Sequence, residues 1–146
     1  MLEKDGILPD VQPQAIVISA RSSVLVIEDD PIQLELLESG LSRNGYHVLA
    51  RRSAKEGRAA AQSEMPDAIL LDLGLPDQDG MELCAQLADD ARTADIPIIV
   101  ISGTTDDDVV RRSRASGGKF FLHKPFDPNA LLLLVSKVID DRISWY

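Results

Sequence analysis

The sequence has one cysteine, few aromatic side chains and far fewer positive charges than negative ones. The single cysteine, Cys84, excludes an internal disulfide, so the chain suits a reducing compartment and we expect a cytoplasmic location. Lysine and arginine number 15 against 24 acidic residues, which gives a net charge of −9. This balance argues against nucleic-acid binding and against docking on an anionic membrane. No apolar run reaches the roughly 18–20 residues that span a bilayer.

The remaining composition fits one globular domain. The chain has 146 residues, of which 45% are hydrophobic and 27% charged, and a chain of that length buries a sufficient core without disulfides. Residues 1–22 contain two prolines and one short apolar piece at 15–19. We therefore expect an N-terminal extension at 1–22, a folded domain at 23–143 and a short tail at 144–146.

Short apolar runs alternate with helical patterns from residue 24 onward. Continuous apolar runs are typical of strands covered on both faces, and the predicted strands are 24–27, 68–71 and 96–101, with weaker candidates at 46–51 and 119–123. Helical patterns follow at 31–43, 54–64, 81–91, 104–115 and 128–143. Proline suits a first helical turn, as at Pro31 and Pro128, and Ser53 and Asp127 are typical N-caps. The alternation predicts an α/β fold with a parallel sheet and helices on both faces.

Polar side chains stand where four of the predicted strands end. Glu28 and Asp29 follow the first strand, Asp72 the third, Ser102 the fourth and Lys124 the fifth. Ligands of parallel α/β sheets bind beyond the carboxyl ends of the strands, so we expect these groups to meet at one edge. Clustered carboxylates repel one another, and a hard divalent cation such as Mg²⁺ resolves that repulsion. With Lys124 as a second positive charge, this set suits phosphoryl transfer, in which a carboxylate can be the nucleophile.

A purely structural interpretation exists for each of these residues alone. Acids that follow a strand often cap the next helix, so Asp29 or Asp30 could serve only that purpose. Ser102 precedes Gly103 in a common turn pair, and Lys124 could be a solvated surface residue. Only the combination of the acids with a lysine at a further strand end favours the functional interpretation.

The ordered blocks resemble the receiver domain of two-component response regulators. The similarity covers about 23–143, through "VLVIEDDP", "AILLDLGLPDQDG", "IPIIVISG", "FFLHKPF" and the capped last helix. The resemblance implies a flavodoxin-like, doubly wound fold of five strand–helix units, whose parallel sheet has the order 2-1-3-4-5. It also implies a phosphoacceptor signalling domain of a phosphorelay rather than a free-standing enzyme.

The resemblance implies roles for individual residues. Asp72 would be the phosphoacceptor, and Glu28 and Asp29 would hold Mg²⁺ together with Asp72 and the backbone carbonyl of Gly74. Lys124 would pair with Asp72 and then with its phosphate.

Two further positions match the switch residues of the family. Ser102 would bond a phosphoryl oxygen, and Phe121 would report the change by packing, because it has no hydroxyl. The phosphoryl donor would be a histidine kinase or a histidine phosphotransfer protein. The helix–strand–helix face at about 104–143 would then control a partner or homodimerisation.

Two other interpretations remain open from the sequence. A phosphatase of the haloacid-dehalogenase type also forms an aspartyl-phosphate with Mg²⁺, but it needs a second Asp where this chain has Gly74. A receiver-like interaction module that is never phosphorylated is the other alternative. The last helix carries two apolar stripes, which indicate either a crowded core helix or a surface for a partner.

Overall fold

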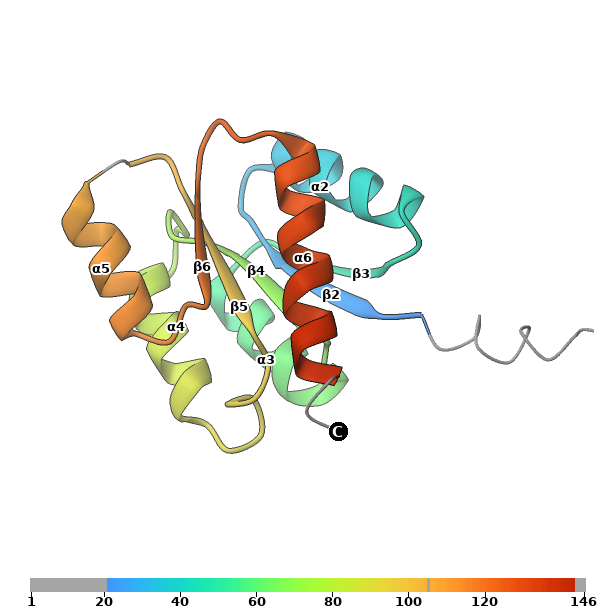
Figure 1. The fold of residues 1–146 in the computed structure, drawn as a ribbon. Coiled ribbons are helices and arrows are strands. Elements are labelled where there is room, and N and C mark those ends of the chain that lie inside the picture. The colour runs from blue at the N-terminus through green and yellow to red at the C-terminus, as the bar shows by residue number, and fades with distance from the viewer. Residues whose placement is uncertain (1–20, 105, 144–146) are drawn as a thin grey trace, which may run out of the picture.

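The computed structural model describes residues 21–104 and 106–143. Most of the predicted extension, including 15–19, and the predicted tail at 144–146 lie outside the described residues. Within the described part, strands and helices alternate as the sequence predicts (Figure 1). Their bounds are β2 Ser23–Ile27, α2 Pro31–Arg43, β3 His47–Arg51, α3 Ala54–Glu64, β4 Ala68–Asp72, α4 Gly80–Asp89, β5 Ile98–Ser102, α5 Asp107–Ala115, β6 Phe120–His123 and α6 Pro128–Ile143.

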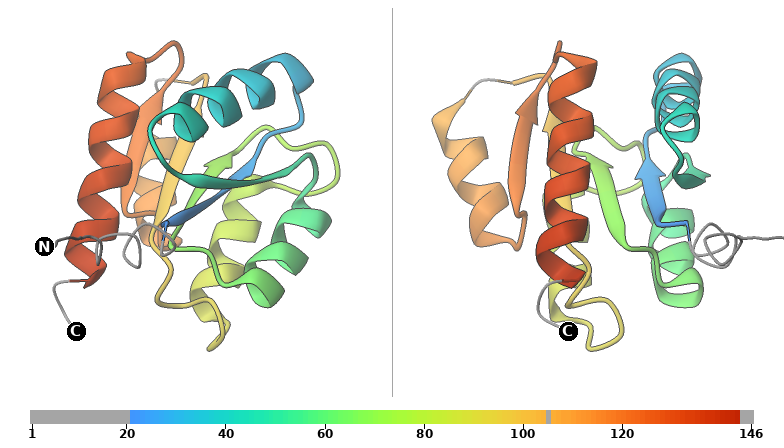
Figure 2. Two further views of the ribbon diagram at one scale, coloured as in Figure 1. Left: turned by 90° about the vertical axis from the view of Figure 1, so that its right-hand side faces the viewer. Right: turned by 45° about the vertical axis from the view of Figure 1, so that its right-hand side comes forward.

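The strands form one parallel sheet in the order β3-β2-β4-β5-β6. Counted along the described strands, this is the predicted order 2-1-3-4-5, and the fold class is confirmed. Helices α2 and α6 cover one face of the sheet, and α3, α4 and α5 cover the other (Figure 2). Both faces are therefore buried, which explains why β2, β4 and β5 are continuously apolar.

The helix starts agree with the capping residues seen in the sequence. The Asp30 side chain accepts the N–H of Ile32 at 3.0 Å, and Pro31 is the first residue of α2. The Ser53 hydroxyl likewise accepts the N–H of Glu56 at 3.1 Å and caps α3. Before α6, the Asp127 carboxylate accepts an N–H of the first turn at 2.9 Å. These contacts satisfy donors that a helix leaves unpaired at its N-terminus.

Some predicted bounds were wrong by a few residues. The helix expected at 104–115 begins at Asp107, because Asp106 adopts an extended backbone and caps it. The strand expected at 96–101 spans Ile98–Ser102, since Pro97 has no N–H to donate to a ladder. Asp72 and Ser102 are thus the last residues of their strands rather than the first residues after them.

Two buried positions in α4 have clear packing roles. Cys84 is fully buried in the core, and burial raises the pKa of its thiol to about 11. A Cβ on Gly80 would lie 2.5 Å from the Leu73 Cα, so only glycine lets α4 begin against the backbone that follows Asp72. No helix within the described residues is both long and apolar enough to cross a bilayer.

We expect Gly80→Ala to destabilise the domain by roughly 1–3 kcal/mol, because a main-chain atom cannot move aside for the new methyl group. Gly103→Ala is the matched control, since a Cβ there would meet nothing within 4 Å among the described residues and the backbone is not left-handed. It should change the stability of the domain by less than about 1 kcal/mol, because a glycine replaced without strain mainly restricts the unfolded chain. Urea unfolding of both variants measures the difference, and equal effects would contradict the packing role of Gly80.

Candidate functional site

Three carboxylates meet at the carboxyl edge of the sheet. β2 and β4 are adjacent, with Ile27 opposite Leu71, so Glu28 and Asp72 follow at neighbouring positions. Each of Glu28, Asp29 and Asp72 offers a carboxylate oxygen, and these oxygens lie within 4.8 Å of one another. Glu28 and Asp72 are buried, at 2% and 7% exposure. The structure thus brings together the acids that the sequence placed at two different strand ends.

Lys124 joins this cluster from the far side of β5. Its Nζ lies 3.0 Å from Glu28 Oε1 and 2.9 Å from Asp72 Oδ2. Its backbone N–H donates to the Ser102 carbonyl at 2.8 Å, which continues the pairing of β5 with β6 past the last strand residue. The ammonium therefore lies between two buried carboxylates and offsets part of their charge.

Backbone N–H groups complete the surroundings of the two buried acids. The Gly74 N–H donates to Asp72 Oδ1 at 3.0 Å, and the Asp30 N–H donates to Glu28 Oε2 at 3.2 Å. The carboxylate of Asp30 instead caps α2, so Asp30 supports the cluster through its main chain. The structure thus shows the helix cap that the sequence allowed for Asp30.

The two expected switch residues lie at different depths. Ser102 is buried at the end of β5, and its hydroxyl accepts the Thr104 N–H at 3.2 Å. Phe121 lies opposite Val100 in the sheet and packs, partly buried, against the core beneath α3 and α4. Ser102 is therefore at the edge of the sheet that carries the acids, whereas Phe121 lies inside the sheet and packs on the core under α3 and α4.

Burial and mutual repulsion shape the protonation of the acids. Burial, and next the contact with Asp72, raise the pKa of Glu28 to about 7. Burial also opposes ionisation of Asp72, but hydrogen bonds from Glu28, the Gly74 N–H and Lys124 hold its pKa below the usual value. The pKa of Lys124 is raised, because the two carboxylates outweigh the effect of burial. Asp72 is thus the more readily ionised member of the pair, and Glu28 is the member that keeps a proton to higher pH.

The donor set fits a hard divalent cation. It consists of carboxylate oxygens from three residues, in the all-oxygen chemistry that Mg²⁺ and Ca²⁺ prefer. Three ionised carboxylates beside one ammonium leave the cluster with a formal charge of −2, so Lys124 alone does not neutralise it. A cation at this position would remove the electrostatic cost of ionising Glu28.

Sequence reasoning missed two residues that hold the loops around the site. The Arg52 guanidinium donates to the Asp29 carbonyl at 3.2 and 3.1 Å. The Asp77 carboxylate accepts the N–H groups of Ala54 and Lys55 at 2.9 and 3.1 Å and so helps to cap α3. Both contacts join residues 22 or 23 positions apart in different loops, so no local pattern in the sequence could have indicated them.

The fold and the acidic edge together define a flavodoxin-like α/β domain with a cluster of three carboxylates at the carboxyl edge of its sheet. The family model of the response regulator receiver domain matches residues 24–136 of the chain. The chain therefore belongs to the response regulator receiver domain family, as its sequence motifs indicated.

Curated relatives agree with this assignment. Protein PilH of Pseudomonas aeruginosa is 31% identical over 118 residues, which cover 80% of this chain and 96% of PilH. Transcriptional regulatory protein KdpE of Staphylococcus aureus is 36% identical over 111 residues, covering 76% of this chain and 47% of KdpE. The DNA-binding dual master transcriptional regulator RpaA of Synechocystis is 37% identical over 124 residues, covering 82% of this chain and 51% of RpaA. The chain thus spans about half the length of KdpE and RpaA.

Solved structures show the same fold. A putative response regulator from Chloroflexus aurantiacus has a TM-score of 0.78 and 28% identity, covering 82% of this chain and 98% of its own. A CheY-like receiver domain protein from Methanospirillum hungatei has a TM-score of 0.82 at 24% identity, covering 87% of this chain and 100% of its own. The second likeness bears on the fold alone.

We expect the stability of the metal-free protein to fall as the pH rises from about 4.5 to about 7, the ordinary and the folded pKa of Glu28. The folded state holds the Glu28 proton more tightly than the unfolded chain does. The stabilisation that results is complete below the ordinary pKa of about 4.5 and is lost as the pH rises through the folded pKa of about 7. Glu28→Gln removes the titration, and its stability should change less over this range. Urea unfolding in chelator at several pH values measures both proteins, and parallel curves would contradict the expectation.

Proposed function

We propose that the chain is a phosphoacceptor in a histidine-to-aspartate phosphorelay, with Asp72 as the acceptor. The observation that carries this proposal is the contact of one ionised, buried carboxylate with Lys124 and with the Gly74 N–H, beside two further acids. A buried aspartate whose pKa is held low is a competent nucleophile at neutral pH. Membership of the receiver family supports the same role.

The transfer step follows from this arrangement. A carboxylate oxygen of Asp72 attacks the phosphorus of a phosphohistidine, the new O–P bond forms, and the N–P bond breaks to release the imidazole. Lys124 lies close enough to neutralise charge that develops on the transferred group. Ser102, at the end of the adjacent strand, donates a hydrogen bond from its hydroxyl to a phosphoryl oxygen and keeps its proton.

Mg²⁺ is the cofactor that this proposal assigns to the acidic cluster. Glu28, Asp29 and Asp72 would hold it, with the backbone carbonyl of Gly74 as a further ligand. When bound, the ion supplies positive charge next to the phosphoryl oxygens. The oxygen-only donor set and the unbalanced charge at Glu28 support this assignment.

The phosphoryl donor is a histidine kinase or a histidine phosphotransfer protein, and the output is a change on the face made by α5, β6 and α6. A phosphate adds roughly two negative charges, which draw Ser102 inward. Phe121 then repacks from its partly buried position, and the altered face controls a partner or a homodimer. The domain thereby acts as a signalling switch that takes part in its own phosphorylation and dephosphorylation.

We expect an acyl phosphate with Mg²⁺ to label the wild type and to leave Asp72→Asn unlabelled, because the amide cannot act as the nucleophile. Lys124→Met should slow labelling by roughly 100-fold through loss of charge stabilisation. Asp95→Asn, an exposed aspartate on a distant loop, is the matched control and should label normally. Phosphate-affinity electrophoresis and intact mass measure the product, and equal labelling of Asp72→Asn would overturn the assignment.

Phe121→Ala should label at Asp72 but lose the conformational response, because the change is transmitted by packing of this ring. Amide hydrogen exchange over α5 and β6, with and without phosphorylation, measures the response. Phe126→Ala is the control, since Phe126 is also partly buried but packs on the opposite core, beneath α2 and α6. An unchanged response in Phe121→Ala would exclude this switch.

A further inference from the structure

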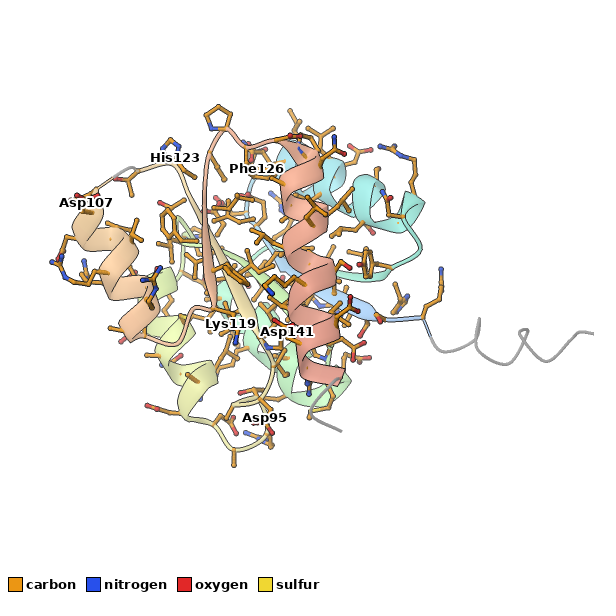
Figure 3. The ribbon with its side chains drawn as sticks, viewed as in Figure 1. Asp95, Asp107, Lys119, His123, Phe126 and Asp141 are labelled. Atoms are coloured by element: carbon orange, nitrogen blue, oxygen red, sulfur yellow. The ribbon has the colours of Figure 1, made fainter. Side chains whose placement is uncertain are left out.

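An apolar groove runs between α2 and α6, on the face opposite α4. Its upper part has a volume of about 550 Å³ and is lined by Leu36, Leu37 and Gly40 of α2 and by Leu131 and Leu132 of α6. Phe126, which lies just before the first turn of α6 (Figure 3), lines the same hollow. We call this hollow and its continuation the α2–α6 groove.

The continuation lies at the C-terminal end of α2. A second hollow of about 380 Å³ is lined by Asn44, Tyr46 and Leu133, and it shares Leu132 with the first. Along α6 the groove extends from Pro128 to Ser136, about 12 Å at the helical rise per residue.

Large apolar side chains around this groove are exposed. Ile32 is 70% exposed and Leu36 69% on α2, and Leu133 is 72% exposed on α6. The other apolar side of α6 is in the core, where Val135 and Ile139 are buried. The structure thus divides α6 between core and surface, and apolar surface that gathers along a groove is typical of a docking site.

Gly40 points to an occupant that approaches closely. It stands inside α2, where glycine is less favourable than alanine. Within the described residues, nothing beyond its own helix lies within 4 Å of where its Cβ would stand, so no internal contact requires glycine. A group that packs against the backbone of α2 from outside would require it.

The N-terminal part of the chain enters the domain beside the lower end of this groove. The Ser22 carbonyl accepts the His47 N–H at 2.9 Å, and His47 follows Tyr46, which lines the groove. The apolar stretch at 15–19, Ala-Ile-Val-Ile-Ser, ends three residues before Ser22. An extended chain covers about 3.3–3.6 Å per residue, so residues 15–19 can reach points roughly 10–25 Å from Ser22. This range is long enough to cover the length of the groove.

We propose that residues 15–19 dock in the α2–α6 groove of their own chain. The stretch carries no charge, and its three β-branched residues favour an extended conformation that presents Ile16 and Ile18 on one side. Its short connection to Ser22 gives it an effective concentration in the millimolar range, which makes a small apolar contact sufficient. The docked segment covers Leu36 and Leu133, and it lies on the helix that adjoins the acidic edge.

Cysteine cross-linking in the full chain tests this placement. Ile18→Cys with Leu133→Cys places one thiol in the segment and one on the rim of the groove. Oxidation should close an intramolecular disulfide at least about tenfold faster than in the control pair, because docking holds the two thiols within reach. The control pair is Ile18→Cys with Glu64→Cys. Glu64 is exposed at the end of α3, away from the groove. It is also close to the start of β2, because it stands three residues before Asp67, whose carboxylate accepts the Ser23 N–H at 2.8 Å. The native Cys84 is buried and does not compete.

Two further variants make the cross-link diagnostic. Gly40→Leu would fill the groove, and Ile16→Asp would place a charge in the segment, so each should slow closure in the Leu133 pair to the rate of the control pair. Equal rates in the Leu133 and Glu64 pairs would overturn the proposal. Cross-linked dimers in place of monomers on a non-reducing gel would also overturn it, because a second copy would then occupy the groove.

Discussion

Repulsion among three carboxylates at one edge of the sheet is the constraint on which the site depends. Glu28 and Asp72 are buried on neighbouring strands, and both would resist ionisation without a positive partner. Lys124 supplies one such partner at 2.9 and 3.0 Å, and it reaches the acids from a strand beyond β5. The three carboxylates still outnumber the one ammonium, so the edge remains negative after Lys124 is in place and favours a cation. The proposed Mg²⁺ and phosphate chemistry follows from this remaining imbalance.

The loops around the edge hold the acids through their main chain. The N–H groups of Gly74 and Asp30 point to Asp72 and Glu28, and Arg52 holds the carbonyl of Asp29. Gly80 lets α4 begin directly against the loop that follows Asp72. A site of this kind is preorganised, since its donors are fixed before any phosphoryl group arrives. The close backbone contacts that fix these donors, such as the one at Gly80, tolerate few substitutions.

The two faces of the sheet divide the remaining tasks. Phe121 belongs to the core beneath α3 and α4, whereas α2 and α6 leave an apolar groove on the opposite face. A response transmitted through Phe121 and a segment docked in the groove would therefore begin on opposite faces of the sheet and would both involve α6. Both surfaces adjoin the same strand end, because β6 leads through Lys124 into the first turn of α6.

The sequence by itself determined the alternation of strands and helices, the helix caps and the candidate acids, because periodicity, capping and strand ends are local properties of the chain. The strand order came from family resemblance, since local patterns do not specify which strands pair. Only the tertiary structure decided that Glu28 and Asp72 lie side by side and that Lys124 lies between them. It alone placed Arg52 and Asp77, because their contacts join loops more than 20 residues apart. It also showed that Val138 of one apolar stripe of α6 and Ile139 of the other are both buried, since the burial of each side chain depends on what packs against it.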